Sequence, residues 1–166
     1  MNALMLSRRS RFAQLARVFS GLILWPLMAA APALHAGSIK VVSDARVEAR
    51  AAARDGVPLV LFFSSYSCPY CEIVSSLYLE PLAARGTGAR IREVEVLSEK
   101  GMRDFAGNKS THAAFAAAQR VSVTPVVKFY GPDGSEIADP LIGYSNSDYY
   151  GEYLETSLRK ARARMR

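Results

Sequence analysis

A continuous apolar run, Leu59–Phe63, is the clearest structural signal in the chain. Because neither alternate set of its side chains is polar, the run predicts a central strand that is covered on both faces. Upstream of it, the carboxylate of Asp44 can accept hydrogen bonds from the free amides of a first helical turn, which predicts a helix to about Arg54. Gly56 to Pro58 would end that helix before the strand begins.

A helical spacing of apolar residues follows the predicted strand. Pro81 lacks an N–H group, so we expect it to kink or end this helix. The side that should be buried consists of Ile73, Val74, Leu77, Tyr78 and Leu82. Residues 89–97 then mix apolar and charged side chains and predict a second strand, whereas the polar residues 99–110 predict a connecting excursion.

The last third of the chain predicts two helices and a pair of strands. Ala-rich residues 111–120 predict a helix, and residues 126–130 and 136–142 predict strands that pair across a turn at 131–134. Asn146 is expected to cap a final helix. The buried side of that helix should consist of Tyr150, Tyr153, Leu154, Leu158 and Ala161. This order of elements predicts an α/β fold in which helices flank a central mixed sheet on both faces.

The first 36 residues have the pattern of a secretory signal. Four arginines are followed by a charge-free apolar stretch, residues 18–36, that ends in small residues. We expect cleavage after Ala36, with a cut near Ala31 or Ala33 as a variant. An uncleaved membrane anchor is the alternative, although Pro26 interrupts the apolar run and a full span needs about 20 apolar residues. Residues 37–166 would then form one exported domain, which in a bacterium is periplasmic.

The formal net charge of +6 does not indicate a nucleic-acid-binding protein once its distribution is considered. Four of the 21 basic residues fall in the first 36 residues and five more in the last eight. Residues 37–158 carry 12 basic groups against 15 acidic ones. A basic face for nucleic acid is therefore not supported, and we expect no nucleic-acid partner.

Two cysteines lie directly after the predicted central strand, at the start of the predicted helix. Unpaired N–H groups and the positive end of the helix dipole stabilise a thiolate at Cys68 and lower its pKa. Cys71 lies one helical turn later, within reach of a local disulfide, and Pro69 suits the first helical turn. The pattern predicts that Cys68 is the attacking thiolate and Cys71 the resolving thiol.

A static disulfide and half of a zinc site are the alternatives for this pair of cysteines. A structural zinc site usually has four ligands. Beyond the predicted signal the chain offers only Cys68, Cys71 and His112 as cysteine and histidine ligands. We therefore expect no metal and no cofactor.

Thr124-Pro125 comes just before the predicted strand 126–130. Proline at the first residue of a strand gives up only one amide. If its peptide bond is cis, the chain doubles back beside the Cys68 loop, and the backbone of Thr124 can pair with an extended substrate, as in strand addition. An ordinary strand entry with a trans bond is the alternative.

Together and in this order, these features resemble the thioredoxin superfamily, over Asp44 to Ala163. The features that carry the resemblance are Leu59–Phe63 followed by Cys68-Pro69-Tyr70-Cys71, Thr124-Pro125, the turn at 131–134, and Gly143 before the last helix. The resemblance implies a thioredoxin fold, attack by Cys68 on a substrate disulfide, resolution by Cys71, and a cis bond at Pro125. It also implies substrate contacts by Thr124, Pro125, Pro69 and Tyr70.

The chain departs from thioredoxin beside the cysteines. Ser67 precedes the pair where thioredoxin has Trp, and Pro69-Tyr70 lies between the cysteines, as in glutaredoxins and a disulfide isomerase. Phe62 stands six residues before Cys68, where thioredoxin has a buried Asp that helps to take the proton from the resolving cysteine. Deprotonation of Cys71 must then use water or a nearby polar group such as Glu72, or be slower.

Thr124 also resembles the residue found before the proline in disulfide isomerases, and its hydroxyl could hydrogen-bond the Cys68 sulfur. Those isomerases have a separate dimerisation domain, for which residues 37–166 leave no room, so we expect a monomer. The segment 105–108 and the signal are similar to small exported thioredoxins, including those of sulfur-oxidation clusters, some of which supply reducing power outside the cytoplasm.

The function expected from the sequence is exported thiol–disulfide oxidoreduction. The substrate would be a protein disulfide, the favoured direction is reduction, and a membrane thiol-transfer partner would return the electrons. Contact with the membrane is expected only through an uncleaved signal. Oxidation or isomerisation of disulfides is the alternative within this class.

A metal-binding module with a thioredoxin fold is the alternative outside that class, with Met102 and His112 as candidate ligands. We expect His112 to be a solvated or capping residue instead. The tyrosines expected to pack in the core and against helices are Tyr144, Tyr149, Tyr150 and Tyr153.

Overall fold

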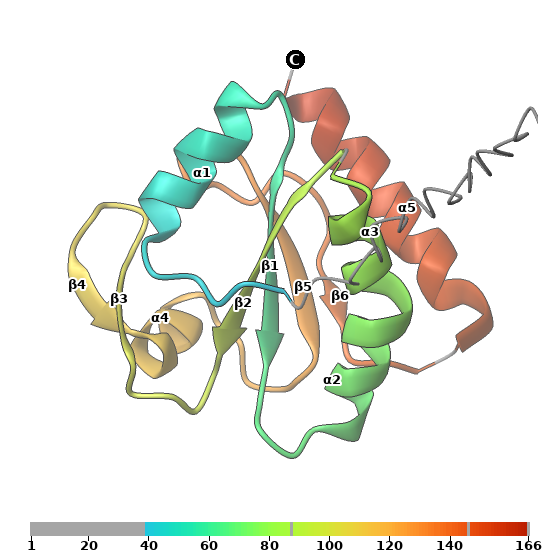
Figure 1. The fold of residues 1–166 in the computed structure, drawn as a ribbon, viewed down its shortest axis with the longest axis horizontal. Coiled ribbons are helices and arrows are strands. Elements are labelled where there is room, and N and C mark those ends of the chain that lie inside the picture. The colour runs from blue at the N-terminus through green and yellow to red at the C-terminus, as the bar shows by residue number, and fades with distance from the viewer. Residues whose placement is uncertain (1–38, 87, 146, 166) are drawn as a thin grey trace, which may run out of the picture. The chain divides into compact units, whose positions relative to one another are not determined.

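The computed structural model describes residues 39–86, 88–145 and 147–165. The predicted signal and the predicted cap Asn146 lie outside these ranges. Within them, four strands form a central sheet in the order β2-β1-β5-β6 (Figure 1). β1 (Leu59–Ser64) is parallel to β2 (Arg90–Glu95) and antiparallel to β5 (Val126–Tyr130), which is antiparallel to β6 (Leu141–Ile142). The predicted mixed sheet is confirmed.

The apolar run in β1 is explained by helices on both faces of the sheet (Figure 1). Leu59, Leu61 and Phe63 pack on the face covered by α1 (Ala45–Arg54) and α4 (His112–Ala118). Val60 and Phe62 point to the opposite face, which is covered by the helices after β1 and by α5 (Ser147–Arg164). Alternation along one strand thus supplies two separate apolar cores.

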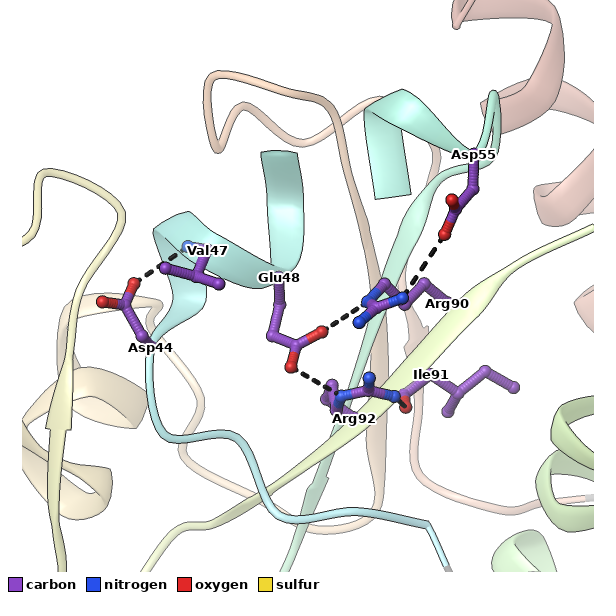
Figure 2. Close-up of polar contacts among 7 residues, drawn as sticks. All are labelled: Asp44, Val47, Glu48, Asp55, Arg90, Ile91 and Arg92. Carbon is purple, nitrogen blue, oxygen red and sulfur yellow. Dashed lines mark hydrogen bonds and ion pairs between the residues drawn. The ribbon is translucent and has the colours of Figure 1, made fainter. Parts of the chain in front are cut away.

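Polar contacts fix α1 against the sheet (Figure 2). Asp44 caps the helix as predicted and accepts a hydrogen bond from the backbone N–H of Val47 at 2.9 Å. Glu48 accepts from the guanidinium groups of Arg90 and Arg92, both on β2. Burial alone would raise the pKa of Glu48, but these hydrogen bonds and charges outweigh it and hold the pKa below its ordinary value.

The helix after β1 contains a wide turn. It begins as α2 (Pro69–Val74), passes through a π-helical turn η1 (Ser75–Leu79) and continues as α3 (Glu80–Ala84). A π turn holds one more residue than an α turn, so the buried positions step five residues, from Val74 to Leu79. Leu77 is therefore 64% exposed, and its predicted burial is wrong. Pro81 does not end the helix, which continues to Ala84. Pro81 lies in the first turn of α3, directly after the wide turn.

Two further predictions need correction. Residues 99–110 include two short strands, β3 (Gly101–Arg103) and β4 (Lys109–Thr111), which pair antiparallel instead of forming only a connection. The strand expected at 136–142 is reduced to β6 and a single bridge from Glu136 to Tyr130. Pro140 has no N–H to donate, which limits pairing before Leu141.

Helix α5 buries the predicted residues Tyr150, Leu154, Leu158 and Ala161, whereas Tyr153 is exposed, contrary to expectation. Among the described helices, none has both the length and the apolar character needed to cross a bilayer.

Candidate active site

A disulfide joins Cys68 and Cys71 at the point where β1 leads into α2. The S–S distance is 2.14 Å and the two Cα atoms lie 5.2 Å apart. Cys68 is the N-cap of α2, and its sulfur accepts a hydrogen bond from the backbone N–H of Cys71 at 3.1 Å. Pro69 occupies the first turn, where its missing N–H costs no hydrogen bond. Ser67 adopts a left-handed backbone with φ +73°, which turns the chain into the helix.

The two sulfur-bearing residues differ in exposure. Cys71 is 5% exposed and packs in the core beneath α2, together with Val74. Cys68 is only partly buried and sits at the rim of that core. An incoming disulfide can therefore reach Cys68 more readily than Cys71.

The loop before β5 lies against the loop that carries the cysteines. The Thr124–Pro125 peptide bond is cis, and Pro125 is buried. The hydroxyls of Thr124 and Ser65 share a hydrogen bond at 3.1 Å. The expected bond from the Thr124 hydroxyl to the Cys68 sulfur is thus replaced by one to the loop itself.

Tyr70 continues the site into a cluster of tyrosines. Its ring lies 5.9 Å from that of Tyr144, which in turn packs against Tyr78 and Tyr150 at 6.3 and 5.3 Å. Tyr144 and Tyr150 therefore pack as predicted. Tyr149 is exposed and does not belong to the core, contrary to expectation.

An open cavity of about 670 Å³ lies beside the disulfide. Its walls contain both cysteines and three carboxyl-bearing side chains, Glu72, Glu80 and Glu93. Glu93 of β2 accepts a hydrogen bond from the Ser64 hydroxyl at 2.6 Å, and Glu80 accepts one from Ser75 at 2.9 Å.

Burial raises the pKa of Glu93. The Ser64 hydrogen bond opposes the shift, and the charges of Glu95 and Glu80 add to it, so the pKa lies above its ordinary value. Glu93 and Glu80 were not predicted as site residues. Their role depends on which strand lies next to β1 and in which register, and the sequence pattern does not give that information.

The comparison with protein families settles the fold. The profile of the thioredoxin-like domain matches residues 45–158. The chain belongs to the thioredoxin-like family. Among curated protein sequences, none matches it.

Solved thioredoxins are similar to this thioredoxin-like chain in fold. A poplar thioredoxin h aligns with a TM-score of 0.53 and 19% identity, covering 72% of this chain and 96% of the other. Oxidised mitochondrial thioredoxin 3 from Saccharomyces cerevisiae gives 0.50 and 20%, covering 74% and 94%. Thioredoxin from Fasciola hepatica gives 0.50 and 22%, covering 74% and 99%. At these identities the likeness shows the thioredoxin fold alone.

The candidate metal ligands lie elsewhere in the thioredoxin-like domain. Met102 is buried in the core beneath α1 and α4. His112 is fully buried at the start of α4, and its Nδ1 accepts from the backbone N–H of Glu95 at 3.2 Å. The expectation of a solvated or capping His112 is wrong, because His112 is buried and Thr111 caps α4. Burial lowers the pKa of His112. In the part of the chain that the structure describes, no group of three or more His, Cys, Asp or Glu residues is arranged to hold a metal ion.

Proposed function

We propose that this protein is an exported thiol–disulfide oxidoreductase that reduces protein disulfides through Cys68 and Cys71. The observation that carries the proposal is the disulfide at the start of α2, in which Cys68 is partly exposed and Cys71 is buried. Such a short loop can open and close without disturbing either core. The coarser conclusion, a thioredoxin fold with an adjacent cysteine pair, follows from the family match and the geometry.

The reaction takes two steps in the reduced protein. The Cys68 thiolate attacks one sulfur of the substrate disulfide, a mixed disulfide forms, and the other substrate sulfur leaves as a thiolate and takes a proton. The Cys71 thiol then loses its proton and attacks the Cys68 sulfur, which releases the second substrate thiol. Two electrons pass to the substrate, and the Cys68–Cys71 disulfide remains.

The amides of the first helical turn support Cys68 as the nucleophile. The bond from the Cys71 N–H to the Cys68 sulfur shows where a thiolate charge would be stabilised. A lowered pKa makes Cys68 the better nucleophile at neutral pH and the better leaving group when Cys71 attacks it.

Substrate contacts are assigned to Pro69 and Tyr70, between the two cysteines, and to Thr124 and Pro125, on the loop that is hydrogen-bonded to Ser65. An extended substrate segment would pair with the backbone of Thr124, and the exposed ring of Tyr70 offers apolar contact.

Export is proposed from the sequence of residues 1–36, which would be cleaved as a signal and direct the protein to the periplasm. We propose separately that the protein is a monomer. In the periplasm a membrane thiol-transfer protein would return two electrons to the Cys68–Cys71 disulfide after each cycle. Oxidation or isomerisation of disulfides is the competing direction. Equilibration with a glutathione redox buffer separates reduction from oxidation, because it measures the reduction potential of the Cys68–Cys71 disulfide. This potential is about −270 mV in thioredoxin and about −120 mV in a strong oxidant.

Trapping with Cys71→Ser tests the proposal. This variant can form the mixed disulfide but cannot resolve it, so covalent adducts with substrate proteins should accumulate in periplasmic extracts and disappear on reduction. Cys68→Ser is the matched control and should trap far less, because the buried sulfur of Cys71 is hard to reach. Equal trapping by the two variants, or none by either, would contradict the proposed exchange.

A further inference from the structure

In the second step of the exchange the Cys71 thiol must lose its proton, so this step requires a proton acceptor. Cys71 is 5% exposed and packs among apolar side chains, an environment that disfavours the thiolate. Phe62, which faces the same core from β1, has no group that can take a proton. The proton of Cys71 must therefore go to water or to a polar group other than residue 62 that lines the cavity.

The pairing of β1 with β2 supplies that group. Phe62 lies directly opposite Glu93, so the two side chains leave the sheet on the same face, the one that α2 covers. Ser64, two residues after Phe62, also points to this face and donates to Glu93 at 2.6 Å. The walls of one cavity contain Ser64, Glu93 and both cysteines.

The other carboxylates of the cavity are less suited. Glu72 on α2 is exposed to solvent, unlike the partly buried Glu93. Glu80 on α3 accepts a hydrogen bond from Ser75, which lies on the neighbouring helical turn and not on the strand that leads into the cysteine loop. Glu93 is partly buried on the rigid sheet, and the hydroxyl that orients it belongs to the strand that leads into the cysteine loop.

We propose that Glu93 is the proton acceptor for Cys71 when the mixed disulfide is resolved. The S–H bond of Cys71 breaks and its proton passes to the Glu93 carboxylate. The Cys71 sulfur then bonds to the Cys68 sulfur, and the bond between Cys68 and the substrate breaks. The departing thiolate takes up the proton that Glu93 received, and Glu93 is a carboxylate again. The inference deepens the proposed function and rests on it.

The groups that face Glu93 hold its pKa above the ordinary value of a carboxyl group. Burial raises its pKa, the charges of Glu80 and Glu95 raise it further, and the Ser64 hydrogen bond lowers it. Glu72 faces the same cavity from α2. The segment before α1 pairs with the backbone of Glu93: the Lys40 carbonyl accepts from the Glu93 N–H, and the Val42 N–H donates to the Glu93 carbonyl, both at 2.9 Å. A base with a raised pKa holds the proton of a thiol more readily than an ordinary carboxylate does.

The test uses the reduced full-length protein and dithiobis(nitrobenzoate), a disulfide that releases one coloured thiolate at each step. The first phase reports attack by Cys68 and the second reports resolution by Cys71. In Glu93→Gln, which keeps an acceptor for Ser64, the second phase should slow by at least ~10-fold, because a positioned acid or base contributes ~10²–10⁴-fold. The first phase should change by less than about twofold. Glu152→Gln, a matched control at an exposed carboxylate on α5 outside the cavity, should leave both phases unchanged.

The pH profile separates a proton acceptor from a merely structural residue. In the natural protein the rate of the second phase should rise with pH through one inflection and then level off. Glu93→Gln should lack that inflection and rise with hydroxide concentration. Ser64→Ala should move the inflection to higher pH, because the hydrogen bond that lowers the pKa of Glu93 is lost.

An unchanged second phase and profile in Glu93→Gln would overturn the role of Glu93 and leave the proposed function intact. Absence of the first phase in the natural protein would overturn both.

Discussion

Ser65 and Thr124, 59 residues apart in the chain, share a hydrogen bond of 3.1 Å between their hydroxyls. The sheet explains why they meet. β1 and β5 are antiparallel, with Phe63 opposite Val126, so the end of one strand lies beside the start of the other. The hydrogen bond thereby joins the loop that carries the cysteines to the loop that carries Pro125, next to the paired strand ends. Strand pairing and one polar contact thus hold the cysteine loop and the Pro125 loop next to each other.

A double-mutant cycle measures this contact. Ser65→Ala and Thr124→Val should each lower the free energy of unfolding of the oxidised protein by about 1 kcal/mol, the typical net contribution of a hydrogen bond. The double variant should lose less than the sum of the two, because the contact can be lost only once. Urea unfolding is the measurement. Ser122→Ala, an exposed change in the same loop, should cost less than about 0.5 kcal/mol. Strictly additive losses would contradict the coupling of the two loops.

Local signals in the sequence were enough for the main elements and the cysteine pair. Asp44 caps α1 as expected, and the apolar run Leu59–Phe63 is buried on both faces as expected. Each of these depends on chemistry within a few residues of chain. The disulfide between Cys68 and Cys71 follows from such a local spacing too.

What the sequence did not predict depends on register or on a local change of helical geometry. Glu93 looked like one charged residue of an alternating strand, and only its pairing with Phe62 places it in the cavity. The β3–β4 strands are three residues long and largely polar, so no apolar pattern marks them. The burial of Leu79 in place of Leu77 depends on a single wide turn.

That wide turn gives a prediction for two leucines only two residues apart. Leu79 is fully buried, so Leu79→Ala should lower the free energy of unfolding by about 2–5 kcal/mol. Leu77 is 64% exposed, so Leu77→Ala should change it by less than about 0.5 kcal/mol. Urea unfolding of the two variants measures the difference. A regular α-helical turn at this point would favour burial of Leu77, and a larger loss for Leu77→Ala would contradict the π-helical turn.

The ion pairs of Glu48 with Arg90 and Arg92 predict a dependence on pH. The pKa of Glu48 is lower in the folded protein than in the unfolded chain, so its stabilising contribution is complete above the unfolded pKa. The contribution is lost as the pH falls through the folded pKa. Glu48→Gln should therefore lower the free energy of unfolding by about 1 kcal/mol at pH 7, and the difference from the natural protein should shrink in acid.

Urea unfolding at neutral and acid pH tests this expectation, with Glu152→Gln on the exposed side of α5 as the control. The control should be nearly neutral at both values. A deficit in Glu48→Gln that persists unchanged in acid would show that packing, and not the charge of the carboxylate, stabilises this contact.

Gly134 allows a test of how the segment 105–108 is held to the sheet. Gly134 has φ +82°, and a Cβ atom there would collide with the ring of Phe105. Phe105 itself packs against Phe115 and Tyr130, so it cannot move without disturbing the core. Gly134→Ala should therefore cost both backbone strain and overpacking, together about 2–4 kcal/mol.

Gly56→Ala separates the two costs, because Gly56 has φ +69° but open space around its Cβ position. It should lose only the backbone part, roughly 1–2 kcal/mol. Urea unfolding of both variants isolates the collision with Phe105 as the difference between them. The contact between Gly134 and Phe105 lies on the face of the sheet opposite the cavity beside the cysteines. Gly134→Ala should therefore leave the rate of thiol–disulfide exchange at Cys68 and Cys71 unchanged. Equal losses in the two variants would mean that Phe105 yields to the new methyl group, and that the segment is held by its hydrogen bonds instead.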